Sequence, residues 1–296
     1  MKLVILSGKG GVGKSMLASA LAMLFAKNQK VIAVDCDVDA PNLAVWLNEI
    51  GNWKEIKKIS VSEKPVINDS KLTKKEARQC VKKCKFNALS LTSEGKLKLN
   101  PFLCEGCGAC EVFCPKGVIK MKPVRNGQIK IKKTKYGFPL IAGQLFPGET
   151  GSGKVVTEIK KEASAEALAK ADKFKDVIEV IDSAPGTGCP VIASLQDSDF
   201  AILVTEPTPS GFSDLKRVLK VVRHFNIPWG IVVNKWDINK NLSQKMKSWA
   251  GKRFLGRISY DKEIFKAVSN LTPIVETNLK AKREIIRIFE KIQREF

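Results

Sequence analysis

Residues 7–15 read Ser-Gly-Lys-Gly-Gly-Val-Gly-Lys-Ser, and this stretch decides the fold. It follows an apolar run at 2–6, typical of a buried strand, and precedes residues 16–27, whose apolar side chains recur at helical spacing. Residues 8–15 fit the phosphate-binding pattern GxxxxGK followed by Ser or Thr, in which glycine N–H groups, Lys14 and the Mg²⁺-binding Ser15 hydroxyl meet the phosphates. The predicted nucleotide-binding residues here are Gly8, Lys9, Gly10, Gly11, Val12, Gly13, Lys14, Ser15 and Met16.

Lys9 is the second lysine of this loop, and it narrows the prediction. The run KGGVGKS resembles the deviant Walker A motif of the MinD/ParA and nitrogenase-iron-protein group of ATPases. The resemblance implies an α/β fold with a mostly parallel, doubly wound sheet, and ATP hydrolysis in an ATP-dependent homodimer. In that family the extra lysine crosses the dimer to the partner's phosphates, and the resemblance implies this role for Lys9.

Two further segments resemble the nucleotide switches of the same family. A predicted strand at 31–34 runs into Asp35-Cys-Asp37-Val-Asp39, and another at 177–181 runs into Asp182. The resemblance assigns Asp37 to the attacking water and Asp182 to Mg²⁺, and phosphoryl transfer needs mainly such positioning and charge compensation. The implied catalytic residues are Lys9, Lys14, Asp37 and Asp182, the implied Mg²⁺ site is Ser15, Asp37 and Asp182, and Gly186 is expected to sense the γ-phosphate. Asp35 and Asp39 are equally well explained as turn or capping residues.

The base-binding end is predicted after a strand at 229–233, where the chain reads Asn234-Lys-Trp-Asp237. Asn234 resembles the family's adenine-contacting asparagine. The whole tetrad, with Asp237, also resembles the guanine-reading motif of GTPases. Lys9 and the switch pattern favour ATP over GTP. Ser259, in the loop expected to close over the base, stands where the family usually has proline.

We expect a cytoplasmic protein, because the N-terminus opens directly into a strand and no apolar run is long enough to span a membrane. In that compartment, eight cysteines indicate metal or redox chemistry rather than disulfides. Residues 104–115 match the bacterial ferredoxin pattern CxxCxxCxxxCP. Buried structural cysteines have no reason to keep these spacings, and a zinc ribbon needs two CxxC pairs farther apart. Both alternatives are therefore less favoured than an iron-sulfur cluster.

An earlier segment resembles the end of a second ferredoxin motif, with Cys80 and Cys84 as its third and fourth cysteines. Its first two positions hold Lys74 and Ala77. In two-cluster ferredoxins the fourth cysteine of each motif ligates the other cluster. The resemblance therefore implies one 4Fe-4S cluster, held by Cys84, Cys104, Cys107 and Cys110. Cys80 and Cys114 are expected to be buried thiols or a disulfide.

The formal net charge of +21 is concentrated in one part of the 296-residue chain. Residues 63–135 hold 18 Lys and Arg against 6 Asp and Glu, a net of +12. We predict a small α+β ferredoxin-like iron-sulfur domain at 63–124, inserted into an ATPase domain formed by 1–62 and 125–296. The basic surface fits an acidic redox or metalloprotein client, while nucleic acid and a merely solvated lysine-rich face are alternatives.

Three other segments receive structural predictions. Residues 148–155 resemble a second phosphate loop, but Val155 cannot ligate Mg²⁺, and Pro147 stands where a buried strand should lead into the loop. We therefore predict a glycine-rich loop that caps a helix over 155–173. Cys189 is predicted to be a small core residue. The final helix, 279–296, has an apolar face that is expected to dock against the sheet rather than lie on a membrane. That face comprises Ile285, Phe289, Ile292 and Phe296.

Two functions fit these features. The first is an ATPase whose nucleotide-dependent dimer closure is coupled to electron transfer or metallocluster delivery through one 4Fe-4S cluster. The second is a positioning ATPase of the ParA or MinD type that binds nucleic acid, or with less support a membrane, and whose cysteine domain is structural. The cysteine spacing favours the first.

Overall fold

The computed structural model describes residues 1–68, 70, 72–115, 117–170 and 177–295. Its centre is a nine-stranded sheet in the order β13-β12-β11-β1-β10-β2-β9-β8-β3, and the first seven of these strands are mutually parallel. The parallel strands are β1 (Lys2–Leu6), β2 (Lys30–Cys36), β9 (Pro139–Leu145), β10 (Val177–Ser183), β11 (Phe200–Thr205), β12 (Trp229–Asn234) and β13 (Phe254–Ile258). The antiparallel strands β8 (Gly127–Lys133) and β3 (Glu55–Ile59) extend the β9 edge.

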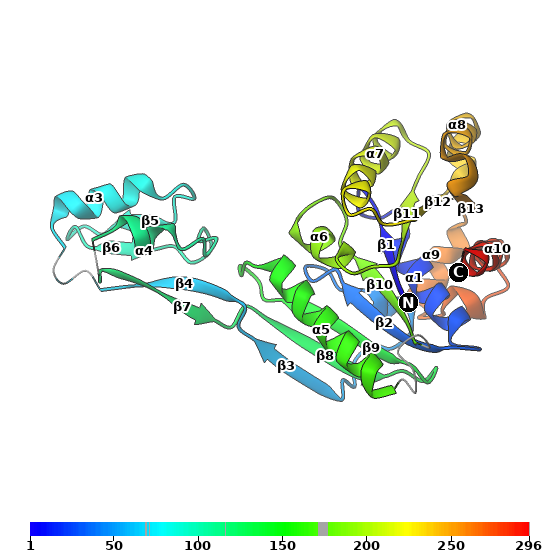
Figure 1. Cartoon of the computed structure of the whole chain (residues 1–296), viewed down its shortest axis with the longest axis horizontal. Helices are drawn as coiled ribbons and strands as arrows, with labels where there is room; N and C mark the ends of the chain where they lie inside the picture. The colour runs from blue at the N-terminus through cyan, green and yellow to red at the C-terminus, as the bar shows by residue number, and fades with distance from the viewer. Residues whose placement is uncertain (69, 71, 116, 171–176, 296) are drawn as a thin grey trace.

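Helices cover both faces of the sheet (Figure 1). One face carries α1 (Lys14–Phe25), α2 (Leu43–Trp46), α9 (Lys262–Ser269) and α10 (Lys280–Arg294), and the other carries α5 (Ser152–Lys170), α6 (Cys189–Leu195), α7 (Pro209–His224) and α8 (Lys240–Ala250). Each face has its own buried core, because the central strands are apolar on both sides. The predicted mostly parallel, doubly wound sheet is confirmed.

The last helix docks on the sheet as predicted. Ile285, Ile288 and Ile292 of α10 are buried, and the Phe289 ring packs edge-on against Phe25 with ring centroids 4.7 Å apart. Phe296 lies outside the described residues, as does the predicted end of the α5 helix at 171–173. Within the described part of the chain, no helix is both long and apolar enough to cross a membrane.

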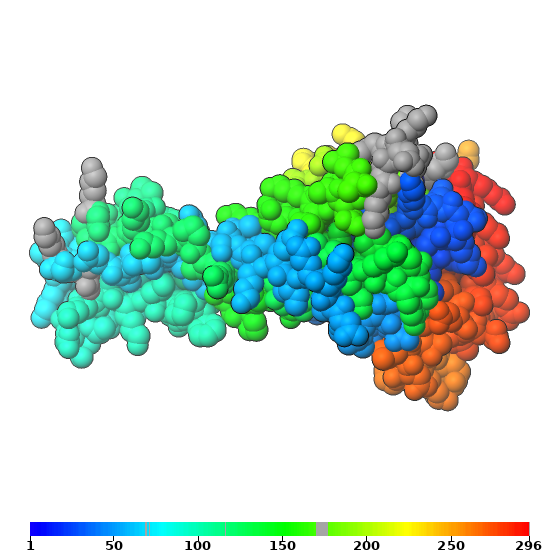
Figure 2. Space-filling model, turned by 90° about the horizontal axis from the view of Figure 1, so that it is seen from below, coloured from blue at the N-terminus to red at the C-terminus, as the bar shows by residue number. Residues whose placement is uncertain are grey.

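Residues 62–124 project from the main body as a separate lobe (Figures 1 and 2). A two-stranded ribbon, β4 (Ser62–Ile67) with β7 (Ile119–Val124), leads to α3 (Lys74–Lys83), the hairpin β5 (Leu89–Leu91) and β6 (Leu97–Leu99), and the short helix α4 (Ala109–Phe113). The start of α3 is fixed by a capping box, in which Thr73 and Glu76 exchange side-chain and backbone hydrogen bonds. We call residues 62–124 the arm.

Candidate active site

The phosphate loop lies where β1 ends and α1 begins. Gly13 precedes α1 with φ of 93°, a left-handed conformation that suits glycine, and a Cβ atom at this position would overlap the Asn234 side chain. The first turn of α1 contains no acidic residue, so its free N–H groups and positive dipole end are available to an anion. Strand, loop and helix therefore form a phosphate-binding site.

A cavity of about 950 Å³ opens beside this loop. Of the residues predicted to bind nucleotide or Mg²⁺, those that line it are Gly10, Gly11, Gly13, Lys14, Ser15, Met16, Asp37 and Asn234. Val12 instead points into the core of the α1 face, and Gly8 lies so close to the Asp214 backbone that a Cβ atom would not fit. The loop thus splits into cavity-lining and packing positions.

Asp182 and Asp37 are the two acidic residues predicted at the phosphate end. Asp182 is fully buried, and among the described residues neither of its carboxylate oxygens has a hydrogen-bond partner. Burial raises its pKa to about 6, although the ammonium of Lys14 opposes the rise. Burial also raises the pKa of Asp37, again against Lys14. A buried carboxylate with unused oxygens, next to the Ser15 hydroxyl, fits a hydrated Mg²⁺ ion.

Asp35 has a structural role, which was one of the two alternatives left open by the sequence. Its Oδ1 accepts a hydrogen bond from the Asp37 N–H at 3.1 Å, and its Oδ2 accepts one from the Leu43 N–H at 2.9 Å. The buried carboxylate therefore holds the loop between β2 and α2, which is the predicted first switch.

Lys9 does not line the cavity. Its Nζ lies 2.5 Å from Oε1 of Glu206, whose other oxygen is 3.2 Å from Nζ of Lys235. Burial alone would raise the pKa of Glu206, but the hydrogen bonds from Lys9 and Lys235 outweigh it and hold the pKa below its usual value. The lysine expected to cross a dimer is thus held by a carboxylate of its own chain.

The tetrad at the end of β12 ties the base-binding loops to the phosphate loop. Asn234 Nδ2 donates to the Val12 carbonyl at 2.8 Å, and Lys235 Nζ donates to the Gly11 carbonyl at 3.3 Å. Asp237 does not line the cavity; its Oδ1 accepts the Tyr260 N–H at 2.8 Å. The carboxylate that a guanine-reading site would use is therefore engaged with the backbone.

Ser259 and Gly186 are held by hydrogen bonds within the chain. Both the N–H and the hydroxyl of Ser259 donate to the Glu284 carboxylate, at 2.7 and 2.8 Å. These bonds hold the loop that was predicted to close over the base, at the position where the resemblance leads one to expect proline. The Gly186 N–H donates to the Ser7 carbonyl at 2.8 Å, so in this conformation it does not face the cavity, and its role towards the γ-phosphate stays a prediction.

A second pocket, of about 80 Å³, lies in the arm. All four predicted cluster ligands, Cys84, Cys104, Cys107 and Cys110, line it together with apolar side chains. Burial, followed by the neighbouring Cys104 and Cys107, raises the pKa of Cys110. The two remaining cysteines of the arm, Cys80 and Cys114, are buried and form a disulfide with Cα atoms 5.5 Å apart.

Cys189 corrects one prediction, because it is exposed rather than part of the core. It is the first residue of α6, and the residues that this helix buries begin only at Val191. The Cys189 side chain and backbone instead lie against Gly153 at the start of α5, where a Cβ atom on the glycine would come within 2.9 Å of the Cys189 Cβ.

Residues 3–274 match the model of the CobQ/CobB/MinD/ParA nucleotide-binding domain. The chain belongs to this family. It is a MinD/ParA-type ATPase. Lys14, Ser15 and Asp37 line its cavity and Asp182 is buried, and their roles in phosphoryl transfer stay predictions.

Relatives of this MinD/ParA-type protein include both uncharacterized and named proteins. An uncharacterized protein of Methanocaldococcus jannaschii is 36% identical over 99% of this chain and 96% of its own length. An iron-sulfur cluster carrier protein of the same organism is 25% identical over 98% of this chain and 83% of its own length. The solved septum site-determining protein MinD of Pyrococcus horikoshii, in complex with Mg-ADP, has a TM-score of 0.59 at 17% identity and covers 99% of this chain and 96% of its own.

The sequence motifs did not predict Glu206, Trp46 or Phe265 as residues of this MinD/ParA site. Glu206 pairs with Lys9, and the aromatic side chains of Trp46 and Phe265 line the cavity. Glu206 directly follows β11, whose apolar run at 200–204 is the signal that could have placed it at the active edge of the sheet. Trp46 and Phe265 belong to no motif, so only the three-dimensional structure brings them together.

Proposed function

We propose that this ATPase carries one 4Fe-4S cluster on Cys84, Cys104, Cys107 and Cys110. The observation that carries the proposal is the single pocket lined by these four cysteines, which are the four that the broken ferredoxin pattern selects. Within the described residues, no three His, Cys, Asp or Glu side chains are arranged around a single metal ion.

The place of a second cluster is occupied by a small core. Ala77, Cys80 and Cys114 are buried together with Leu89, Val118 and neighbouring apolar residues. Ala77 offers no ligand, and the two cysteines are bonded to each other. This packing supports a count of one cluster per chain.

We propose that the cluster, when bound, supplies one-electron transfer or serves as cargo, and that ATP-dependent dimerisation controls its delivery to an acidic redox or metalloprotein client. Support for this coupling comes from a chain of contacts between the two sites. The second switch, after Asp182, leads into α6, and Cys189 at the start of α6 touches Gly153 of α5. Buried Lys160 of α5 donates to the Ala193 and Ser194 carbonyls at the other end of α6.

The segment before α5 continues this path to the arm. Glu149 forms an ion pair of 2.8 Å with Lys64 of β4, and the Thr150 hydroxyl lies 3.2 Å from that of Ser62. Gly148 packs against the Phe102 ring, two residues before Cys104. A movement of α6 with the nucleotide state would therefore be passed through α5 to the cysteine pocket.

Anaerobic reconstitution followed by iron and sulfide analysis tests the cluster. We expect about four irons per chain in the wild type, loss of the cluster in Cys84→Ser, and an unchanged content in the matched control Cys114→Ser. Eight irons, or the reverse dependence on the two cysteines, would contradict the ligand set.

Iron chelation tests the coupling with the reconstituted protein. The rate at which bathophenanthroline removes iron should differ between MgATP and MgADP, and Lys14→Ala should abolish the difference. Equal rates with both nucleotides in the wild type would rule out the coupling and leave the cluster assignment intact.

A further inference from the structure

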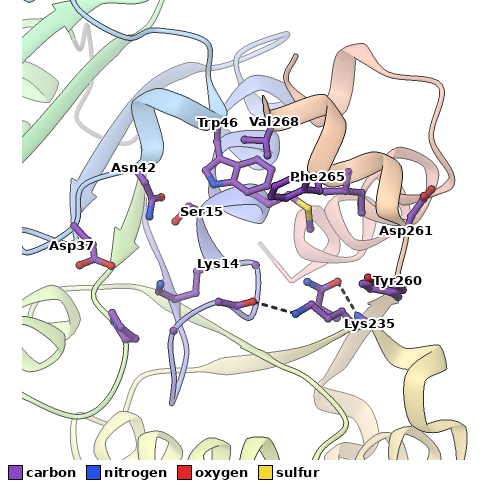
Figure 3. A pocket seen from close by; sticks show the side chains of 18 of the residues that line it. Lys14, Ser15, Asp37, Asn42, Trp46, Lys235, Tyr260, Asp261, Phe265 and Val268 are labelled. Carbon is purple, nitrogen blue, oxygen red and sulfur yellow. Dashed lines mark hydrogen bonds between the residues drawn. The ribbon is translucent and has the colours of Figure 1, made fainter. Parts of the chain in front are cut away.

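The end of the nucleotide cavity opposite Asp37 has an aromatic wall. Trp46 of α2 and Phe265 and Val268 of α9 lie along one side, and Lys235 and Tyr260 lie along the other, as Figure 3 shows. Lys14 and Ser15 mark the phosphate end. The cavity thus has a charged end and a second end lined mainly by flat and apolar side chains.

The aromatic residues of this wall remain largely open to solvent. Phe265 exposes 74% of its surface and Tyr260 51%, and α9 contributes no fully buried residue to the core. Trp46 is half-buried at the edge of the α1 face. Folding alone does not bury these large rings. Such exposure is expected of aromatic side chains that a ligand covers when it binds.

The polar side chains nearby are largely engaged within the chain. Asn234 bonds to Val12, Lys235 bonds to Gly11 and Glu206, and Asp237 bonds to the Tyr260 backbone. Asp261 and Lys266, which also line the cavity, are bonded to the backbone N–H and the side chain of Glu263. This end therefore offers a nucleobase chiefly ring faces, the aliphatic stem of Lys235 and the Lys262 side chain. Stacking suits such a surface, because every base has a π-face.

We propose that Trp46 and Phe265 bind the purine of ATP by stacking and packing, so that the first switch segment contacts the base as well as the phosphates. Trp46 lies three residues after Leu43, whose N–H is bonded to Asp35, and the same loop carries Asp37. A bound base would hold α2 in place and, through this short loop, restrain Asp37. The proposal rests on the ATPase activity of the family and is independent of the iron-sulfur cluster.

Calorimetric titration tests the proposal with two probes. These are MgATP and inorganic tripolyphosphate with Mg²⁺. Loss of one stacked aromatic should weaken ATP binding by roughly tenfold, and tripolyphosphate binding should not change because it lacks a base. We expect this pattern for both Trp46→Ala and Phe265→Ala. Trp46→Phe, which keeps a ring, should bind ATP nearly as the wild type does.

The matched control is Trp249→Ala, which removes an exposed tryptophan of α8 outside the cavity and should leave both affinities unchanged. Phe265 is so exposed that its replacement does not threaten folding, and that variant decides the outcome if Trp46→Ala is unstable. ATP affinities equal to the wild type, or equal losses for ATP and tripolyphosphate, would overturn the proposal. A Trp46→Phe variant as weak as Trp46→Ala would also overturn it.

Discussion

Replacing Glu206 with glutamine should strengthen the ATP-dependent dimer that we propose. In the structure, Glu206 holds Lys9 at 2.5 Å and is itself only 13% exposed, whereas the Lys9 side chain is 33% exposed. Lys9 has to leave this partner before it reaches the phosphates of a second protomer. Glutamine removes the negative charge and retains the size and one hydrogen-bond acceptor. The hydrogen bond from Lys235 to the Gly11 carbonyl does not involve Glu206 and should remain.

The size of the effect follows from the exposure of the pair. Ion pairs that solvent reaches contribute at most about 1 kcal/mol each. Both protomers release a lysine when the dimer forms, so at most about 2 kcal/mol is recovered per dimer. Since 1.4 kcal/mol corresponds to a factor of ten, the dimer dissociation constant should fall by up to about 30-fold.

Sedimentation equilibrium with Mg²⁺ and a non-hydrolysable ATP analogue measures this constant. Lys9→Ala should still bind nucleotide but should not dimerise, and the double variant Lys9→Ala/Glu206→Gln should behave like Lys9→Ala, because Glu206 acts through the lysine. A Glu206→Gln protein that dimerises no more tightly than the wild type would refute this reasoning. So would a double variant that regains the dimer.

Three further outcomes are expected. Lys160→Met should lower the free energy of unfolding by roughly 1–3 kcal/mol in a denaturant titration, because the carbonyls of Ala193 and Ser194 lose the ammonium donor, although Ser194 keeps a second one, from Ser198. Burial raises the pKa of Glu179, so this carboxyl binds a proton more readily in the folded protein than in the unfolded one. Its contribution to stability should therefore decline as pH rises above about 4.5. Glu179→Gln should flatten that decline when thermal unfolding is measured at a series of pH values. Association of the arm with an acidic client should weaken steeply as salt shortens the Debye length below about 8 Å, and a salt-independent affinity would exclude an electrostatic interface.

The local motifs account for most of what the sequence predicted. Glycine and lysine positions in the phosphate loop are dictated by contacts within a few residues, so the pattern alone located the strand, loop and helix. The antiparallel extension by β8 and β3 was not predicted as part of the main sheet, because pairing between distant strands leaves no mark in a short run.

Interactions between distant segments explain what was missed at the site. Glu206 meets Lys9 only because β11 lies beside β1 in the sheet. The exposure of Cys189 depends on how the first turn of α6 meets Gly153, and residue type favoured burial instead. The disulfide was foreseen as an alternative because both motifs constrained its cysteines.

The pairing of β3 with β8 has a consequence for how such a chain is assembled from parts. Ile59, the last residue of β3, stands opposite Gly127, the first residue of β8, so the chain leaves the sheet and returns to it at adjoining positions. A tight turn of a few residues could join the two strands without disturbing their register. The whole arm therefore occupies the position of a hairpin loop, where a cofactor-binding module can be gained, lost or exchanged over evolutionary time at little entropic cost to the sheet.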